Sequence, residues 1–330
     1  MLRCSLPDVE QAWINVVVLR KAVEADGICS FELAGTNGGA LPPFSAGSHI
    51  DVEVSAGKVR QYSLCNDPQD QHRYVIGVLR EPNSRGGSVS MIETVREGDT
   101  LRISAPRNHF PLAPEAKHVV LLAGGIGITP ILSMAERLSQ SDTPFRLVYA
   151  NRSRSRTAFI DRIENSRYRQ SVHFHFDEES EGRLLDLKKS IGEPTPGFHL
   201  YVCGPPGFIK AVLEVAASSG WDGSSLHREY FQPVTDTAAV SAASFLVRIA
   251  STGSDYPVPP HRSVVEVLAE HGVEIPVSCE QGVCGTCVTR ILEGIPDHRD
   301  MFMTDQEHAR NDQFTPCCSR AKTSLLVLDL

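Results

Sequence analysis

The chain has 330 residues, of which 41% are hydrophobic and 22% charged, and its net charge is −8. This length exceeds one ordinary domain and fits two or three, and the composition is that of a globular protein. No run approaches the eighteen or so apolar residues of a membrane span, and no basic patch typical of nucleic-acid binding is evident. The N-terminus lacks the apolar core of a secretory signal. We therefore expect a cytoplasmic protein without membrane or nucleic-acid partners.

The cysteines are unevenly distributed. There are nine, an odd number, and five of them lie between residues 279 and 318. Stable disulfides are rare in the cytoplasm, so this crowding indicates a metal site. Residues 240–330 also hold seven Lys or Arg against twelve Asp or Glu, and thus −5 of the net charge. This acidic segment would either steer a basic partner or only maintain solubility, and the sequence leaves both open.

Residues 1–112 have the pattern of an all-β domain. Short β-prone runs alternate with Gly, Pro, Asn and Asp, as in a barrel or sandwich. The predicted strands cover residues 12–20, 28–33, 48–54, 59–65, 73–79 and 100–106.

Residues 113–231 alternate strands with helices, which predicts a parallel sheet with helical crossovers. The predicted strands are 118–125, 145–150, 172–176 and 198–204, and the helices 128–140, 157–166 and 205–220. A segment rich in Ala, Ser and Thr, residues 232–243, is predicted to be a linker. The remaining residues, 244–330, predict a small α+β unit with strands at 245–250, 287–294 and 325–330 and a helix at 263–272.

Two glycine-containing loops end strands of the predicted parallel sheet and begin helices. They are "AGGIGITP" (123–130) and "CGPPGF" (203–208). Ligands of open parallel sheets bind at the carboxyl ends of strands, and a helix N-terminus favours a phosphate. The first loop departs from the G-x-G-x-x-G fingerprint and could be only a tight turn. The presence of two such loops on one sheet edge favours a dinucleotide site.

The all-β domain contains two further candidate segments. In "RQYSL" (60–64), Arg60 and Tyr62 share a strand face, where an arginine can clamp a phosphate and a tyrosine can stack on a planar ring. In "SRGGSVSMI" (84–92), two glycines and a serine begin a predicted short helix, which offers a second phosphate site. An exposed Arg beside a core Tyr, and an ordinary Ser N-cap, remain the structural alternatives.

The cysteine motif is more specific. Cys279-x4-Cys284-x2-Cys287 is the plant-type spacing of a [2Fe–2S] cluster, whereas zinc sites usually pair cysteines as C-x2-4-C twice. Cys317 and Cys318 both offer the fourth thiolate, and we choose Cys317 because 29 residues separate it from Cys287. Four cysteines leave no need for histidine ligands, so we expect the neighbouring histidines to be surface residues. These are His261, His271, His298 and His308.

Together these motifs resemble the phthalate dioxygenase reductase and vanillate O-demethylase reductase family, over essentially the whole chain. The resemblance implies an antiparallel β-barrel flavin domain (1–112), an α/β parallel-sheet nicotinamide domain (113–231) and an α+β, β-grasp ferredoxin domain (244–330). It also implies FMN, NADH and a [2Fe–2S] cluster as cofactors. FMN follows from the order of the domains in the family, not from spacing in this sequence.

The resemblance also implies residue roles. Arg60 would hold the flavin phosphate, Tyr62 would lie against the isoalloxazine ring, and Ser63 would be near its N5 edge. Thr129 would touch flavin and nicotinamide, and Cys203 would face the nicotinamide. Phe231 would cover the flavin, although a packing role at a domain junction is nearly as good an explanation. The complete implied set of catalytic residues is Ser63, Thr129 and Cys203. The remaining cofactor-binding residues are Arg60, Gln61, Tyr62, Gly86, Gly87, Ser88, Gly124, Gly125, Gly127, Pro130, Arg152, Gly204, Pro205 and Phe231, and the metal ligands are Cys279, Cys284, Cys287 and Cys317.

The implied function is that of a reductase that passes electrons from NADH through FMN and the cluster to a terminal Rieske oxygenase. A flavin belongs between the other two centres because a nicotinamide gives two electrons together and the cluster takes one. We expect a monomer. The alternatives are an FAD-containing NAD(P)H reductase with another acceptor, and a redox-sensing binding module. Arg152, Arg154 and Arg156 follow the second strand of the α/β segment and could favour NADPH, but the family favours NADH.

Overall fold

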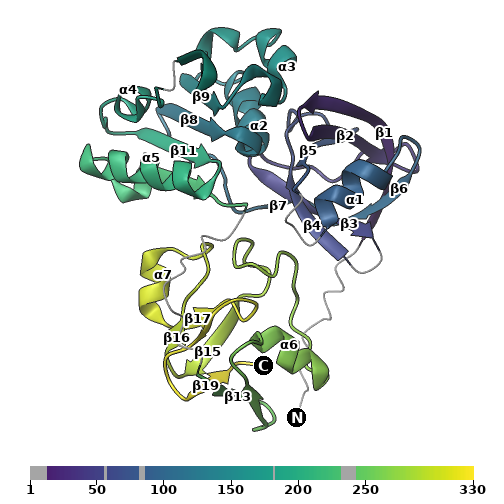
Figure 1. Ribbon diagram of the computed structural model, residues 1–330, viewed down its shortest axis with the longest axis vertical. Coiled ribbons are helices and arrows are strands. Elements are labelled where there is room, and N and C mark those ends of the chain that lie inside the picture. The colour runs from purple at the N-terminus through teal and green to yellow at the C-terminus, as the bar shows by residue number, and fades with distance from the viewer. Residues whose placement is uncertain (1–12, 56–57, 82–85, 181–182, 232–242) are drawn as a thin grey trace. The chain divides into compact units, whose positions relative to one another are not determined.

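The computed structural model describes residues 13–55, 58–81, 86–180, 183–231 and 243–330, with three main sheets in the predicted order (Figure 1). The backbone divides into two compact units, Met1–Glu229 and Tyr230–Leu330. The first two predicted domains therefore belong to one unit, and the cysteine-rich domain belongs to the other. The predicted linker, except for Ala243, lies outside the described residues. Within the described ranges, no helix is long and apolar enough to cross a membrane.

The first sheet is antiparallel. Its strands follow the order β4-β3-β6-β1-β2-β5, with β7 beside β3. An isolated bridge between Leu64 and Ile76 joins the end of β4 to β5, so the two edges of this order meet. The elements are β1 (Ile14–Ala25), β2 (Ile28–Gly35), β3 (Ser48–Ser55), β4 (Lys58–Ser63), β5 (Tyr74–Leu79), α1 (Gly87–Thr94), β6 (Thr100–Ile103) and β7 (Arg107–Asn108).

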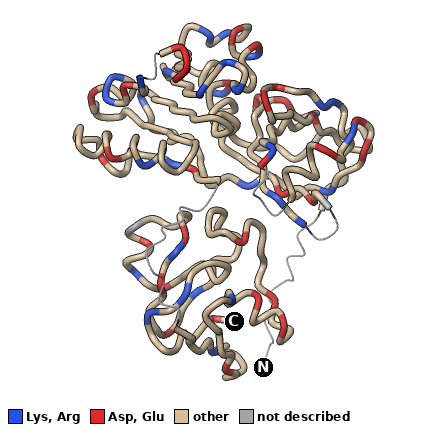
Figure 2. The backbone as a smooth tube through the Cα atoms, viewed as in Figure 1, with Lys and Arg blue, Asp and Glu red and all other residues tan. Residues whose placement is uncertain are grey.

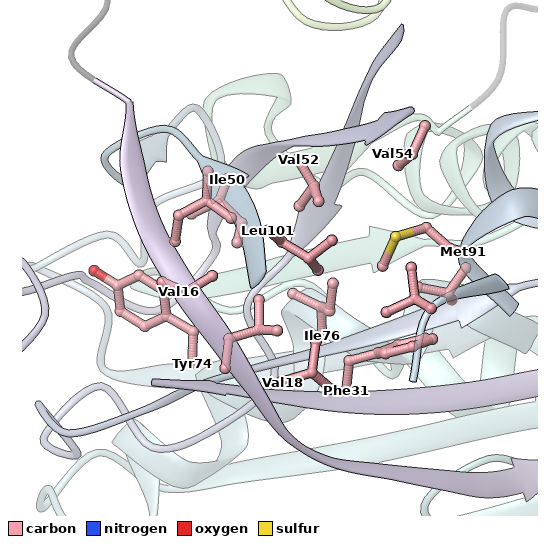
Figure 3. Packing of buried hydrophobic residues seen from close by; sticks show 14 of the residues in the cluster. Val16, Val18, Phe31, Ile50, Val52, Val54, Tyr74, Ile76, Met91 and Leu101 are labelled. Carbon is pink, nitrogen blue, oxygen red and sulfur yellow. The ribbon is translucent and has the colours of Figure 1, made fainter. Parts of the chain in front are cut away.

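Alternating side chains of these strands build one apolar core. Val16 and Val18 of β1 are buried, and Figure 3 shows them gathered with Phe31, Ile76 and Met91. Complete burial of each such side chain contributes about 1.5–3 kcal/mol. Met91 belongs to α1, so the core holds this helix against the sheet.

The second sheet is parallel, in the order β10-β9-β8-β11-β12. Its central strand, β8, is apolar almost throughout because helices cover such sheets on both faces. The strand order reverses between β8 and β11, and this switch point is where parallel sheets bind ligands. The elements are β8 (His118–Gly124), α2 (Ile128–Leu138), β9 (Phe145–Asn151), α3 (Ile160–Glu164), β10 (Val172–Phe176), α4 (Leu187–Ile191), β11 (Phe198–Cys203), α5 (Pro206–Ser218) and β12 (Leu226–Glu229), with short 3₁₀ turns that include η1 (Gly125–Gly127).

The second unit holds a mixed sheet in the order β14-β13-β19-β15-β17 and a small sheet of β16 and β18. Helices α6 and α7 both begin with capping boxes, in which Ser263 pairs with Glu266 and Thr304 with Glu307. The elements are β13 (Phe245–Ile249), β14 (Asp255–Val258), α6 (Val264–Glu270), β15 (Thr289–Glu293), β16 (Pro296–Asp297), α7 (Asp305–Arg310), β17 (Gln313–Phe314), β18 (Arg320–Ala321) and β19 (Leu325–Leu328).

Every predicted strand is present, with small differences at the ends. The predicted helix over 157–166 is shorter, because a regular α-helix covers only Ile160–Glu164. The sequence analysis missed several short elements, namely β7, β12, β14, β16, β17, β18, α4 and α7. Strand β12 has four residues and only one strongly apolar side chain, so no local pattern in the sequence predicts that it pairs with β11. Helix α7 is polar, although its capping box was a readable signal.

Candidate active site and metal centre

The two glycine loops of the parallel sheet lie directly against each other at its switch point. A Cβ atom added to Gly127 would be 2.3 Å from the carbonyl oxygen of Cys203, and one added to Gly204 would be 3.0 Å from Cα of Gly124. Only glycine allows this approach of two backbones. A Cβ at Gly125 would meet nothing within 4 Å, so this residue leaves open space. The pair of loops can thus form the floor of a site for a flat ligand.

Thr129 connects this edge of the parallel sheet to the antiparallel sheet. The residue is buried in the first turn of α2, beside the equally buried Pro130, and its hydroxyl donates to the carbonyl of Ile126 at 3.1 Å. A Cβ on Gly77 of β5 would lie 2.8 Å from the Thr129 methyl group. The predicted flavin and nicotinamide regions therefore adjoin at Thr129.

Strand β4 presents the predicted flavin residues on two faces. Tyr62 is paired with Ile50 and packs against the core, and its hydroxyl is buried without a hydrogen-bond partner in the described part of the chain. Burial raises the pKa of Tyr62, so the hydroxyl stays protonated. Ser63 is buried on the other face. An orphaned buried hydroxyl fits a bound molecule that supplies its polar partner.

Gln61 occupies the same face as Ser63 but is bound within the protein. Its amide donates to Asp51 at 3.0 Å, and Arg107 donates to the other oxygen of Asp51 at 2.6 Å. The side chain of Gln61 therefore belongs to a polar network with Asp51 and Arg107.

The start of α1 lies against Arg60. A Cβ at Gly87 would be 2.7 Å from Nε of Arg60, and Gly86 is the N-cap residue. The hydroxyl of Ser88 accepts a hydrogen bond from the amide of Glu81 at 3.1 Å. A guanidinium and a helix N-terminus, both positive, thus converge, which is an arrangement that favours a phosphate.

The four predicted cluster ligands fall into two neighbouring pairs. The thiols of Cys279 and Cys284 are hydrogen-bonded, and this bond lowers the pKa of Cys284 to about 6 and raises that of Cys279. The thiol of Cys317 is hydrogen-bonded to that of Cys287, and this bond is the largest contribution to a pKa raised to about 12. Backbone amides of Gln281 and Thr286 point at two of the sulfurs, at 3.3 and 3.5 Å. Amides that donate to sulfur stabilise thiolates, the form that binds iron.

Cys318 lies at the same loop, since a Cβ on Gly282 would be 2.5 Å from its sulfur, but its thiol is hydrogen-bonded to that of Cys317 and not to that of Cys287. Its sulfur lies 3.3 Å from the hydroxyl of Thr315 and 3.9 Å from that of Ser319. The chain therefore directs Cys317, rather than Cys318, toward Cys287. This geometry fits the choice of Cys317 as the fourth ligand.

Comparison with known proteins gives the family. Residues 247–322 match the 2Fe-2S iron-sulfur cluster binding domain, and residues 102–226 match the N-terminal domain of the dimethylamine monooxygenase subunit DmmA-like family. Vanillate O-demethylase oxidoreductase of Pseudomonas putida is 54% identical over 96% of this chain and 100% of its own length. Phthalate dioxygenase reductase of Burkholderia cepacia is 41% identical, over 97% of this chain and 98% of its own. The chain belongs to this family of oxygenase reductases.

Solved structures agree with this family. A phthalate dioxygenase reductase, described as a modular structure for electron transfer from pyridine nucleotides to [2Fe-2S], has a TM-score of 0.75 at 41% identity and covers 97% of this chain and 99% of its own. An intact type IV self-sufficient cytochrome P450 monooxygenase has a TM-score of 0.84 at 36% identity, and this chain spans 41% of its length. The chain is thus a multidomain oxidoreductase with a [2Fe–2S] domain, and these predictions are confirmed.

The site of this reductase contains one residue that the sequence analysis missed. Glu229 ends β12 and is the register partner of Cys203 at the end of β11. Its Oε2 atom is buried without a hydrogen-bond partner in the described ranges, and burial raises its pKa to about 8. The pKa of Cys203 is raised mainly by burial and secondly by the charge of the neighbouring Glu229. An acidic residue at the end of a strand that follows the second glycine loop was the available signal.

The arginines after β9 differ from one another. Arg154 is paired with Glu179 at 3.1 Å and Glu164 at 3.9 Å, and its guanidinium lies over the ring of Phe176. Arg152 is exposed. Arg154 therefore has competing acidic partners, which weakens the case that it receives a 2′-phosphate.

The histidine prediction is wrong at one position. His261 and His271 are exposed, as expected, but the side chain of His298 is only 9% exposed. The chain after β16 folds back against α7, which buries this ring beside His308. Nothing local in the sequence signals that contact.

Proposed function

We propose that this reductase transfers electrons from NADH through FMN and the [2Fe–2S] cluster to a terminal Rieske oxygenase. When bound, a flavin accepts hydride from the nicotinamide and supplies single electrons to the cluster. The observation that carries the proposal is the contact of Thr129 with Gly77, which joins the glycine loops to the sheet of Arg60 and Tyr62 in one compact unit.

The flavin would be held through residues of the antiparallel sheet and α1. Arg60 and the helix start at Gly86, Gly87 and Ser88 would bind its phosphate. Tyr62 would lie against the ring, and Ser63 would be near the N5 edge. The meeting of the sheet edges at Leu64 and Ile76 supports a closed barrel for this domain.

The nicotinamide would lie on the loops at the switch point. Gly124, Gly125, Gly127, Gly204 and Pro205 would border it, with Cys203 beneath and Thr129 between the two rings. Glu229 would be neutral at pH 7, because its pKa of about 8 keeps the proton on the carboxyl. A neutral carboxyl can donate a hydrogen bond to a carboxamide without adding charge next to a reacting hydride. We infer that Glu229 positions the nicotinamide.

NADH is the proposed coenzyme. A 2′-phosphate gains affinity from free arginines. Arg154 is paired with Glu164 and Glu179, whereas Arg152 and Arg156 are exposed, so the choice of NADH rests on the family resemblance. Arg152 would contact the adenosine side of the coenzyme.

The cluster would be bound by Cys279, Cys284, Cys287 and Cys317 in a β-grasp ferredoxin domain that spans residues 244–330. The flavin domain would span residues 1–112 and the nicotinamide domain residues 113–231. The relatives support an oxygenase as partner, since they include a vanillate O-demethylase oxidoreductase, a phthalate dioxygenase reductase and a carnitine monooxygenase reductase subunit. Figure 2 shows acidic and basic residues along both units, and the −5 charge of residues 240–330 favours a partner with a basic surface. We also propose that the protein is cytoplasmic and monomeric.

The proposal is tested with the purified holoprotein. The expected results are one FMN released per chain on denaturation, cytochrome c reduction supported by NADH, and a kcat/KM for NADH at least tenfold above that for NADPH. Release of FAD would favour a reductase of a different type. Absence of turnover with both coenzymes would favour a redox-sensing module and refute the proposal.

A further inference from the structure

The second unit holds a group of metal-binding side chains apart from the four cysteines. His298 and Asp300 lie between β16 and α7, and His308 lies on α7. One ligand atom from each residue lies within 4.8 Å of those of the other two. From the geometry that follows, we propose that these residues form a second metal site that binds a divalent first-row transition metal such as Zn²⁺.

His298 supplies the first argument. Its side chain is 9% exposed, and neither ring nitrogen has a hydrogen-bond partner of normal geometry among the described residues, although the side chain of Asn311 and the backbone of His308 lie close to the ring. Oδ1 of Asp300 is 3.8 Å from Nδ1 of His298, which is too far for a hydrogen bond. Buried polar atoms are rarely left unpaired, because each costs about 1–3 kcal/mol. A metal ion at this ring removes that cost.

Asp300 supplies the second argument. Its side chain is fully buried, and within the described ranges the basic residues that lie beside it are His298 and His308. Nε2 of His308 is 3.2 Å from both carboxylate oxygens, and the amide of Met303 donates to Oδ2 at 2.8 Å. A buried carboxylate needs a positive partner. A divalent ion supplies it.

The two rings are arranged so that they can share an ion. His298 and His308 stack with centroids 4.3 Å apart and planes inclined by 23°. Zinc bonds of about 2.0–2.2 Å in a tetrahedron bring ligand atoms to about 3.4 Å from one another. The observed spread of up to 4.8 Å closes if the His298 ring rotates toward Asp300 and away from Asn311.

The donor set selects the class of metal. Two imidazole nitrogens and one carboxylate suit zinc and its first-row neighbours, whereas calcium and magnesium require oxygen ligands. Three protein ligands leave one position for water, and the 25% exposure of His308 gives that position access to solvent.

The site directly adjoins the loop that holds the cluster ligands. The amide of Met301 donates to the carbonyl of Gly282 at 2.9 Å, and a Cβ on Gly282 would lie 2.9 Å from Cα of Asp300. Gly282 lies between Cys279 and Cys284. An ion bound by Asp300 would therefore lie next to this loop, close enough to affect the magnetic relaxation of a reduced cluster.

The test uses the iron-loaded holoprotein and Zn²⁺ as the probe. After equilibration with Zn²⁺ and gel filtration, the natural protein is expected to retain one zinc per chain in addition to the cluster iron. The variants His298→Gln and His308→Gln should each bind Zn²⁺ at least tenfold more weakly. His261→Gln, which changes an exposed histidine of the same unit, should bind as the natural protein does. Unchanged visible absorbance of the cluster verifies that each variant is folded.

A second readout locates the ion. Co²⁺, which is paramagnetic, should raise the microwave power that half-saturates the EPR signal of the reduced cluster, and Zn²⁺ should not. The effect should persist in His261→Gln and disappear in the His298→Gln, His308→Gln double variant. Equal zinc binding by the double variant, no retained zinc in the natural protein, or relaxation by Co²⁺ that survives the double substitution would each overturn the proposal.

Discussion

Replacing Glu229 by glutamine should change the pH dependence of stability and of hydride transfer. The carboxyl has a pKa of about 8 in the folded chain, against 4.5 for the unperturbed group. When the pH rises from 4.5 to 8, the unfolded chain therefore loses this proton before the folded chain does. Stability falls over that interval, and the full penalty is present above pH 8. Glutamine keeps a similar shape, has no proton to lose and removes the penalty.

The magnitude follows from the shift. A difference of about 3.5 pKa units corresponds to about 5 kcal/mol at most. Glu229 is half-buried as a whole residue, although its Oε2 is buried, so solvent reduces the effect and we expect about 2–3 kcal/mol. The Glu229→Gln variant should therefore match the natural protein near pH 4 and exceed it by this amount at pH 9.

Urea unfolding followed by tryptophan fluorescence measures this difference, because Trp13 and Trp221 both belong to the first unit. The exposed Glu214, changed to Gln, is the matched control and should alter stability by less than about 0.5 kcal/mol at every pH. In stopped-flow reduction by NADH, the natural protein should lose rate with an apparent pKa near 8, and the variant should not. A stability difference that is constant from pH 5 to 9 would refute the assignment of a neutral, buried Glu229.

Two pairs of substitutions test the cluster and the loops. Cys317→Ser should abolish the visible absorbance of the cluster, whereas Cys318→Ser should preserve it, because only the thiol of Cys317 faces Cys287; the reverse result would show that Cys318 is the ligand. Gly127→Ala should destabilise the first unit by about 1–3 kcal/mol and raise the KM for NADH, because the new methyl group meets backbone atoms of Cys203 at 2.3–2.4 Å. Gly207→Ala on α5, where a Cβ meets nothing within 4 Å, is its control, and equal effects of the two changes would contradict the role of the close loop contact.

Much of this protein is determined by short stretches of sequence. The order of the three sheets follows from local patterns of apolar residues and turns, and these patterns depend on neighbours within a few positions. The spacing of Cys279, Cys284 and Cys287 indicates a [2Fe–2S] cluster for the same reason, since one loop must wrap one metal group. Arg60 and Tyr62 were placed on one strand face by alternation alone, and the register with Val52 and Ile50 agrees.

Other features depend on contacts between segments distant in sequence, and only the tertiary structure decides them. Glu229 is buried because β12 pairs with β11, and His298 is buried because the chain after β16 packs on α7. Arg154 is paired because β10 brings Glu179 to it. Burial and charge pairing are properties of a three-dimensional neighbourhood. The identity of a residue in the sequence therefore does not determine whether its side chain is neutral, paired or available to a ligand.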